Sequence, residues 1–405
     1  MLKLNFTLRK ISADIVFPIS QQPVRNGIII IDEQGVLKEN VIEPNNLDHS
    51  ISDVEKFEGF ICPGFINAHC HLELSWLKNR IPEHTGLDNF IINLQNIRKE
   101  EDDISTEEYI FSAEQEMKNG GIVAVGDICN TNITFSLKEK SNIYFHNFIE
   151  TFASAPQKAE KAFEKSLRLI DEVTQIKKNN SASITPHAPY SLSKKLFQLI
   201  KEHNENTGEI LSIHHQESEE ENKFFLTKNG NIKDMHFRFG VEHSDFSNCG
   251  KRPIEAISEH LAKNNKIQLV HNTVATETDI DFALNYFSDI YWCFCPNANL
   301  YIEQKLPDFA MFFNKSCKIT LGTDSFASNK NLSILDEIKT IRSSMPFIPL
   351  QEMLKWATLN GAEFLNISEK YGSLEKGKSP GVILLENVNT ASNHLTRSSN
   401  IKVIF

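Results

Sequence analysis

The chain has 405 residues, of which 40% are hydrophobic and 23% are charged. It carries enough apolar material for a large core, which excludes a chain that is mainly disordered. The 42 basic and 53 acidic residues give a formal net charge of −11. This charge argues against non-specific binding to nucleic acid and against docking on an anionic membrane surface, because both need a basic footprint.

The apolar runs and the cysteines bear on the cellular compartment. No apolar run approaches the roughly 18 residues of a membrane span. The first ten residues, MLKLNFTLRK, lack the apolar stretch and the cleavage site of a signal peptide. The chain contains seven cysteines, an odd number, and none of them forms a CxxC pair. We therefore expect reduced thiols in a cytoplasmic protein.

Both ends of the chain have the pattern of small β structures. Short β-like runs alternate with turn signals there, and Asn26-Gly27 is a typical hairpin signal. The pattern predicts one small β domain that combines residues 1–58 and 370–405. The candidate strands are residues 15–17, 27–31, 35–37, 372–374, 381–385 and 401–405.

The middle of the chain, residues 59–369, alternates apolar strand-like runs with segments of helical composition. Such alternation predicts a parallel sheet, and eight units predict a closed (β/α)8 barrel of the TIM type within an α/β protein. A doubly wound open sheet is the alternative, but no GxGxxG follows the first run. The candidate strands are residues 60–68, 121–128, 143–149, 182–185, 209–213, 266–270, 290–294 and 319–322. The helical segments include residues 105–118, 158–176, 194–205, 255–263 and 332–343.

Histidines and acidic residues follow four of these runs directly. In a parallel barrel the reactive groups collect at the carboxyl ends of the strands. His69 and His71 are two apart, so on a strand both imidazoles face one point and form half of a metal site. His214, His271 and Asp324 follow the fifth, sixth and eighth runs. Each residue alone would pass as an ordinary polar side chain, but together they indicate a metal site.

This joint pattern resembles the amidohydrolase superfamily, in its branch of cytosine-deaminase-like and chlorohydrolase-like proteins. The resemblance spans nearly the whole chain and implies a barrel with a small β-sandwich side domain built from both termini. The matching stretches are PGFINAHCHLEL (63–74), TPHAPYSLS (185–193), SIHHQES (212–218), LVHNT (269–273), FCPNANL (294–300), LGTDSFASN (321–329), WATLNGAEFL (356–365) and GSLEKGK (372–378).

The resemblance implies a ligand set for one divalent ion, with zinc expected and iron as the alternative. Three histidine nitrogens and one carboxylate would leave a position for water, whose pKa the ion would lower toward about 7. Two-metal members of the superfamily use a carboxylated lysine after the fourth strand. Here Pro186-His187 stands at that point, which favours one ion. The implied ligands are His69, His71, His214 and Asp324.

The resemblance also implies catalytic roles. Asp324 would take the proton of the water, and His271 would orient the resulting hydroxide. Glu217 would protonate a ring nitrogen and then the leaving group, so that two carboxylates divide the acid and base work. His187 would contact the substrate. His215 would point away from the ligands on its strand and serve a structural role.

The reaction that the resemblance implies for this set of residues is hydrolytic deamination of an aminated N-heterocycle. The segment HLELSWL (71–77) resembles aminofutalosine deaminases of menaquinone synthesis, which act on an adenine-type ring joined to a sugar. That resemblance would place Glu73 and Trp76 near the substrate, with packing as the alternative role for Trp76. It also implies a homodimer.

Three alternatives stay open from the sequence alone. The same scaffold could hydrolyse a chloro-triazine-like carbon or a cyclic amide such as imidazolonepropionate. A non-catalytic scaffold protein is the third reading, although such relatives should have lost metal ligands. The phenylalanine-rich segment 218–250 is either a lid over the site or a short extra helix with its own apolar cluster.

Overall fold

The computed structural model of the chain describes residues 8–44, 53–100, 106–176, 179–227, 229–241, 245–246 and 250–405. The chain divides into two compact units. The first comprises residues 1–67, 115–124 and 333–405, and the second comprises residues 68–114 and 125–332.

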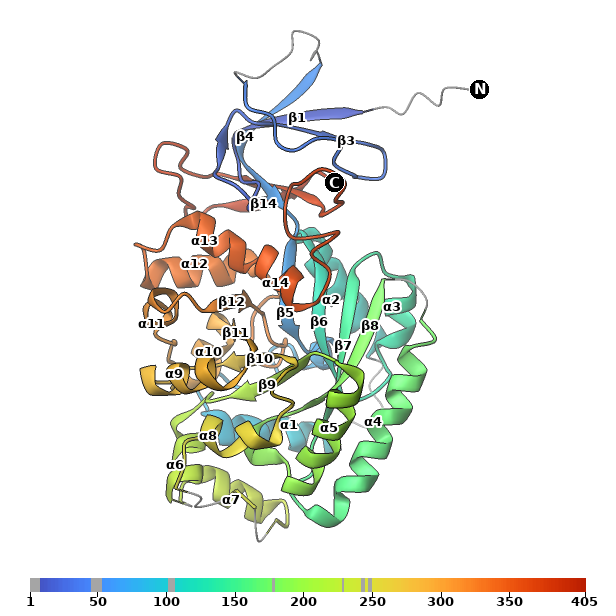
Figure 1. Cartoon of the computed structure of the whole chain (residues 1–405), viewed down its shortest axis with the longest axis vertical. Helices are drawn as coiled ribbons and strands as arrows, with labels where there is room; N and C mark the ends of the chain where they lie inside the picture. The colour runs from blue at the N-terminus through green and yellow to red at the C-terminus, as the bar shows by residue number, and fades with distance from the viewer. Residues whose placement is uncertain are drawn as a thin grey trace. The chain divides into compact units, whose positions relative to one another are not determined.

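The first unit contains a six-stranded sheet to which segments near both ends of the chain contribute (Figure 1). The strand order is β14-β13-β4-β1-β2, and β3 also pairs with β1. Strands β1 and β4 are parallel, whereas β13 is antiparallel to both of its neighbours. Buried aliphatic side chains from β1, β3, β4 and β13 form one apolar cluster. The strands are β1 (Arg9–Val16), β2 (Val24–Arg25), β3 (Ile28–Ile31), β4 (Val54–Pro63), β13 (Val382–Glu386) and β14 (Asn400–Val403).

The prediction of a hairpin at Asn26-Gly27 is wrong. Strands β2 and β3 both lie antiparallel along β1 in one continuous register, so Asn26-Gly27 interrupts a strand and does not reverse it. Asn26 adopts a left-handed φ of 51°. Its N–H donates to the carbonyl of Asp14 at 3.0 Å. Asn and Gly tolerate this conformation in either setting, so the dipeptide alone could not distinguish a kink from a turn.

The second unit is built around two four-stranded sheets, of order β5-β6-β7-β8 and β12-β11-β10-β9. The pairings β7–β8, β9–β10, β10–β11 and β11–β12 are parallel. All eight strands overlap predicted runs, and the fold is mixed α/β of the TIM-barrel type. The strands are β5 (Phe65–Cys70), β6 (Ile122–Cys129), β7 (Tyr144–Thr151), β8 (Asn180–Pro186), β9 (Leu211–His215), β10 (Lys266–His271), β11 (Asp289–Phe294) and β12 (Lys318–Leu321).

Backbone hydrogen bonds also join the ends of the two sheets. The N–H of His214 donates to the carbonyl of His187 at 2.9 Å, which links β9 to the end of β8. On the other side, the N–H groups of Thr323 and Asp324 both donate to the carbonyl of His69 at 3.1 Å. These contacts bring the ends of β5 and β12 together.

The first of these eight strands begins later than predicted. The run 60–68 is divided at Gly64, where β4 of the six-stranded sheet ends and β5 begins. Side chains on both sides of the break are fully buried, so the apolar pattern contains no sign of it. A Cβ on Gly64 would approach Val123 to 2.4 Å, which explains the need for glycine at this close crossing.

Helices follow most of the strands. Helix α5 illustrates the local cause: the Ser193 hydroxyl accepts from the Leu196 N–H at its start, and Gly208 ends it with a φ of 71°. Helices α4 and α5 lie along β7 and β8 in Figure 1, and α4 buries Leu169 and Val173 against Ile149 of β7. The helices of the second unit are α1 (Leu87–Glu100), α3 (Phe135–Lys140), α4 (Ala159–Val173), α5 (Lys194–Thr207), α6 (Glu219–Thr227), α7 (Asn231–Arg238), α8 (Pro253–Ile257), α9 (Glu277–Tyr286), α10 (Pro296–Glu303) and α11 (Phe309–Asn314).

The remaining helices are α-helices of the first unit and short 3-10 turns. Helix α2 runs from Glu107 to Asn119 and has residues in both units. The helices of the first unit are α12 (Ile334–Ser344), α13 (Leu350–Trp356) and α14 (Leu359–Phe364). The 3-10 turns are η2 (Leu72–Leu77), η3 (Pro156–Lys158), η4 (Pro189–Ser191) and η5 (Ser258–His260).

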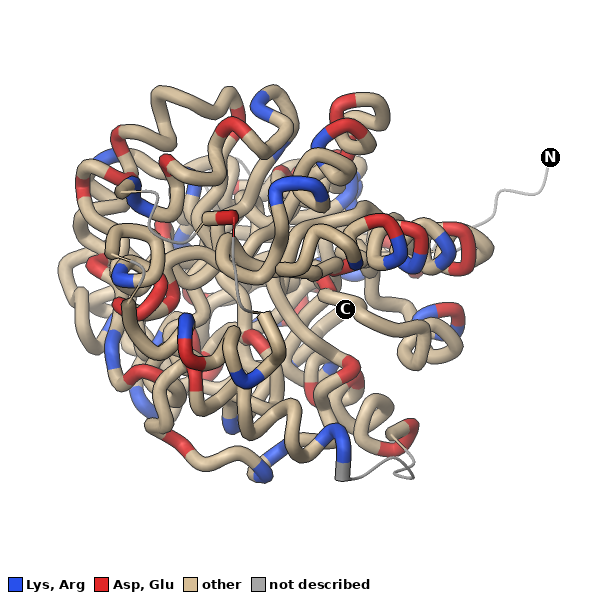
Figure 2. Tube along the Cα trace, turned by 90° about the horizontal axis from the view of Figure 1, so that it is seen from below, with Lys and Arg blue, Asp and Glu red and all other residues tan. Residues whose placement is uncertain are grey.

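The charged residues are interspersed along the chain. In Figure 2, basic and acidic segments alternate along many of the helices. None of the described helices is both long enough and apolar enough to cross a membrane. Six of the seven cysteines are described, and all six are buried and free, as expected for reduced thiols. Cys249 lies outside the described residues.

Candidate metal and catalytic site

His69 and His71 bring two imidazole nitrogens together at the end of β5. His69 lies on the strand, and His71 follows it just before η2. Their Nε2 atoms are 3.1 Å apart, and both side chains are buried. The predicted pairing of the two rings is therefore present.

His214 adds a third nitrogen from β9. Its Nδ1–H donates to the carbonyl of His187 at 2.9 Å, which turns Nε2 toward the other two rings. The Nε2 atoms of His214 and His71 are 3.3 Å apart. The Nδ1–H of His215, the next residue, donates to Asn272 Oδ1 at 3.0 Å, so this ring points elsewhere, as predicted for a structural role.

Asp324 supplies a carboxylate just beyond β12. One oxygen, Oδ1, is 3.3 Å from His71 Nε2 and 3.8 Å from His69 Nε2. The other oxygen accepts from the Ser328 hydroxyl at 2.5 Å, which fixes the rotation of the group. Gly322 allows this approach, because a Cβ there would come within 2.7 Å of His69 Cβ.

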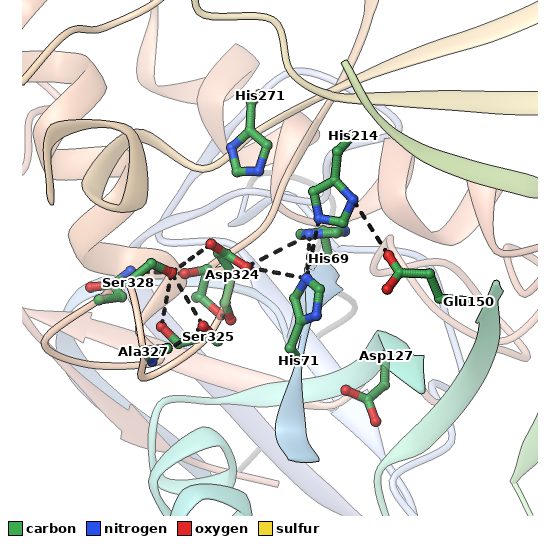
Figure 3. A network of polar contacts seen from close by, with 12 residues as sticks. His69, His71, Asp127, Glu150, His214, His271, Asp324, Ser325, Ala327 and Ser328 are labelled. Atoms are coloured by element: carbon green, nitrogen blue, oxygen red, sulfur yellow. Dashed lines mark hydrogen bonds and ion pairs between the residues drawn. The ribbon is translucent and has the colours of Figure 1, made fainter. Parts of the chain in front are cut away.

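These donors fit a small divalent ion (Figure 3). A tetrahedral ion bound at 2.0–2.1 Å holds its nitrogen ligands about 3.3 Å apart, and the separations here are 3.1 and 3.3 Å. Burial lowers the pKa of all three histidines, that of His214 to about 3, so the rings are neutral and present lone pairs. Three groups of described residues could hold a metal ion, namely His69 with His71 and Asp324, His69 with His214 and His271, and Glu150 with His187 and His214.

His271 and Glu217 face each other beside the ligand cluster. The Nδ1–H of His271 donates to the amide oxygen of Asn299 at 2.8 Å, so Nε2 carries the lone pair. This Nε2 is 3.7 Å from Glu217 Oε1. Burial, and then the negative charge of Asp324, raise the pKa of Glu217 well above its ordinary value. A carboxyl group in this state is suited to donate a proton.

The backbone at the strand ends is strained. The non-glycine residues with left-handed φ angles include Gln216 at 45°, His271 at 73° and Asp324 at 57°. Such conformations cost on the order of 1 kcal/mol or more each and persist where the surroundings enforce them. All three lie within or next to the cluster of site residues, which is typical of a functional site.

A buried ion pair supports the turn after His71. Asp127 Oδ1 accepts the N–H of Leu72 at 2.8 Å, at the point where η2 begins. Its other oxygen is 2.5 Å from Lys138 Nζ, and both side chains are fully buried. Lys138 also contacts Asn147 Oδ1 at 2.6 Å and Cys129 Sγ at 3.2 Å. The sequence analysis missed this pair. Asp127 ends an apolar run as the ligands do, which was the available signal.

The site lies in a cavity of about 710 Å³. Its lining includes His71, His214 and Asp324, together with Glu217 and His271. His187 also lines it, and its Nδ1 lies 2.9 Å from the Ser191 hydroxyl. Burial lowers the pKa of His187 to about 4, so this ring is neutral. Apolar side chains line much of the rest, among them Leu74, Leu87, Phe90, Leu94, Phe239 and Ile302.

Glu73 and Trp76 are absent from the described residues that line this cavity. The Glu73 carboxylate is buried and accepts the N–H groups of Asn130 and Thr131 at 3.0 and 3.1 Å. It also lies 3.5 Å from Arg98. Trp76 is 7% exposed and packs within the protein. Glu73 therefore supports the wall from behind, through Arg98 and Asn130, which do line it.

The segment after β9 forms part of the cavity wall. Helix α7 places Met235 and His236 at the cavity, followed by Phe239. Phe224 and Phe225 of α6 are buried, and Phe225 lies 6.0 Å from Phe246 between ring centroids. The segment thus has its own apolar cluster, which is one of the two predicted alternatives, and it also contributes side chains to the cavity wall. Residues 228, 242–244 and 247–249 of the segment lie outside the described residues.

The fold and the ligand cluster define a metal-dependent hydrolase of the barrel type. The chain belongs to the amidohydrolase family, whose sequence model matches residues 60–405. This confirms the resemblance stated from the sequence and makes the protein a hydrolase of the class that acts on carbon–nitrogen bonds.

Similar proteins are known from sequence and from structure. A 5-methylthioadenosine/S-adenosylhomocysteine deaminase of Thermococcus sibiricus is 24% identical and covers 90% of this chain and 85% of that protein. Helicobacter pylori aminofutalosine deaminase in complex with methylthio-coformycin matches with a TM-score of 0.81 and 23% identity, over 94% of each chain. Atrazine chlorohydrolase from Arthrobacter aurescens, complexed with zinc, matches with a TM-score of 0.74 and 17% identity, over 95% and 89% of the chains.

Proposed function

We propose that the protein is a metal-dependent hydrolytic deaminase of a purine-type base or nucleoside such as aminofutalosine. The observation that carries this proposal is the convergence of three imidazole nitrogens and one carboxylate beside a carboxyl group with a raised pKa. The names of the relatives support deamination, because several of them are deaminases of adenine nucleosides.

Four residues would hold one divalent ion, with zinc proposed and iron as the alternative. A bound ion would act as a Lewis acid and make water a nucleophile at neutral pH. The zinc in the structural neighbour supports the choice of metal. The proposed ligands are His69, His71, His214 and Asp324.

The remaining steps concern this chain's own groups. Asp324 accepts the proton of the attacking water, and the neutral Nε2 of His271 orients that water by accepting a hydrogen bond. Glu217 donates its proton to the ring nitrogen next to the attacked carbon. A carbon–oxygen bond forms, the carbon–nitrogen bond to the amino group breaks, and the group leaves as ammonia after receiving a proton.

The cavity supports a substrate larger than a free base. Its volume of about 710 Å³ far exceeds that of one fused ring system. Basic residues at spacings of three and four along η3 and α4 face it, while the acidic residues of α4 do not line it. This rim would attract an anionic outer part of a substrate, although the chain as a whole is acidic. These basic residues are Lys158, Lys161, Lys165 and Arg168.

Contact with the substrate is proposed for His187, which lies in the wall near the ligand cluster. Glu73 would act on the substrate only through Arg98 and Asn130, both of which line the cavity. For Trp76, its burial supports a packing role.

We further infer a closed (β/α)8 barrel of residues 59–369 with a β-sandwich side domain of residues 1–58 and 370–405. The hydrogen bonds from His214 to His187 and from Asp324 to His69 support ring closure, because they join the two four-stranded sheets on both sides. A homodimer stays a prediction from the resemblance, and light scattering coupled to size exclusion tests it.

A coupled ammonia assay over aminated nucleosides and bases tests the proposed function. Ammonia release from adenosine-type nucleosides is the expected result, with near-stoichiometric metal in the purified protein. Chloride release from a chloro-triazine or opening of imidazolonepropionate, without any ammonia from the panel, would favour the other hydrolases. A metal-free protein that turns over none of these compounds would favour a scaffold.

A further inference from the structure

Glu150, near the end of β7, has a carboxylate oxygen that no described donor of the protein satisfies. Its side chain is 3% exposed and lines the cavity. One oxygen, Oε2, accepts the amide N–H of Asn130 at 2.9 Å. The other, Oε1, is buried and has no hydrogen-bond partner. Leaving such an atom unsatisfied costs about 1–3 kcal/mol, so its presence calls for an explanation.

The nearest donor, His214, cannot satisfy this oxygen. Its Nδ1 lies 3.5 Å from Oε1, but the single hydrogen on Nδ1 is directed to the carbonyl of His187 at 2.9 Å. The other ring nitrogen faces the ligand cluster (Figure 3). The lone pairs of Glu150 Oε1 therefore have no partner among the described residues, although the side chain that carries them lines the cavity.

The surroundings of Glu150 restrict the chemistry of that ligand. Arg98 and Lys165 line the same part of the cavity, and Lys165 donates to the carbonyl of Asn130 at 2.9 Å. These positive charges disfavour a cationic group, and the carboxylate of Glu150 itself disfavours an anionic one. A neutral donor is the chemistry that fits, and a hydroxyl group is the common neutral donor of a nucleoside.

We propose that Glu150 is a specificity-determining residue that accepts a hydrogen bond from a sugar hydroxyl of the substrate. This inference rests on the proposed function and deepens it. Glu150 contacts His214, a proposed ligand, so it lies close to the reacting end of the cavity. We therefore expect it to meet the sugar that is joined to the ring. The bond distinguishes a nucleoside from the free base.

The test compares enzyme variants and substrates in pairs. Glu150→Leu should lower kcat/KM for adenosine by about 10- to 100-fold, the range for a lost hydrogen bond to a charged group. The kcat/KM for adenine should stay unchanged. One of 2′-, 3′- and 5′-deoxyadenosine should lack the hydroxyl that Glu150 bonds. With the wild type, the kcat/KM for this analogue should fall below that for adenosine by the same factor. Glu150→Leu should cause no further fall in the kcat/KM for this analogue. Glu150→Gln should recover most activity, because its amide still bonds a hydroxyl.

Glu172→Leu is the matched control. Glu172 accepts the amide N–H of Asn132 at 2.8 Å, as Glu150 does from Asn130, but on the exposed surface outside the cavity. Its kinetics should equal those of the wild type. Equal losses for adenine and adenosine in Glu150→Leu, or a loss of bound metal, would overturn the inference and assign Glu150 to the support of His214.

Failure of the proposed function has a different signature. In that case the wild type deaminates neither compound, and calorimetric binding of adenosine then tests the inference alone. Binding weakened about tenfold in Glu150→Leu, with adenine binding unchanged, would support a hydroxyl contact. Equal binding of adenosine to both proteins would contradict it.

Discussion

Replacing Lys138 by methionine should destabilise the protein strongly, because it strands a buried charge. Lys138 and Asp127 are both fully buried, with Nζ and Oδ2 at 2.5 Å. The only other polar contacts of Nζ among the described residues are Asn147 Oδ1 at 2.6 Å and Cys129 Sγ at 3.2 Å. Methionine fills a similar volume but offers Asp127 no positive charge and no donor.

The magnitude follows from the burial of both partners. Removing one member of a fully buried pair costs about 3–5 kcal/mol, whereas replacing both by neutral groups of similar volume is often nearly neutral. Lys138→Met should therefore lower the free energy of unfolding by about 3–5 kcal/mol. Adding Asp127→Asn should restore most of this loss, because the amide oxygen still accepts the Leu72 N–H and carries no charge.

Urea unfolding of the metal-free proteins measures both effects. The double variant should be more stable than Lys138→Met alone, which gives a favourable coupling energy in the cycle. Lys140→Met, an exposed lysine on the same helix, serves as the control and should change stability by less than about 0.5 kcal/mol. A loss below about 1 kcal/mol for Lys138→Met, or a double variant as unstable as the sum of the two, would refute the reasoning.

Three further predictions concern the site. His69→Ala should purify without metal, and near-stoichiometric metal by mass spectrometry would contradict its role as a ligand. Glu217→Gln should keep the metal but lose about 10²- to 10⁴-fold in turnover in the ammonia assay, and unchanged turnover would exclude it as the acid. Burial raises the pKa of Glu221 from 4.5 to about 8, so the folded state holds this proton more tightly than the unfolded state does. The free energy of unfolding should therefore fall by up to about 1.4 kcal/mol for each pH unit as the pH rises between these two values. Glu221→Gln should remove this slope in urea unfolding at several pH values, and an identical slope in both proteins would refute the assignment.

The proposed ligands could be selected from the sequence because each follows an apolar run at the carboxyl end of a strand. His69 and His71 share a direction over extended backbone, and Asp324 reaches them through backbone bonds to His69. Parallel strands bring such ends together whatever the intervening residues are. The start of β5 could not be found in the same way, because burial on both sides of Gly64 removes the periodic signal.

The supporting residues were out of reach for a different reason. Lys138 lies in the helical stretch FSLKEK, where its composition resembles that of a solvated surface. Packing alone buries Lys138 and leaves Lys140 exposed. Asn299 and Ser328, which hold His271 and Asp324, likewise come from segments whose contacts the sequence does not specify. Glu150 could not be found from the sequence either, because it is a single carboxylate after an apolar run and no second residue forms a recognisable motif with it.

Glu73 shows where the alternation of side-chain direction along a strand no longer predicts which way a side chain points. Residues two apart point the same way only while the backbone is extended. His71 is the last residue before the 3-10 turn η2, which turns the chain so that Glu73 meets the N–H groups of Asn130 and Thr131. Glu73 is close to His71 in sequence but is not among the described residues that line the cavity, while Glu150, 79 positions after His71, lines the cavity from another strand. In a barrel, the position of a residue at a strand end is a better guide to its place in the site than its distance along the chain from a known ligand.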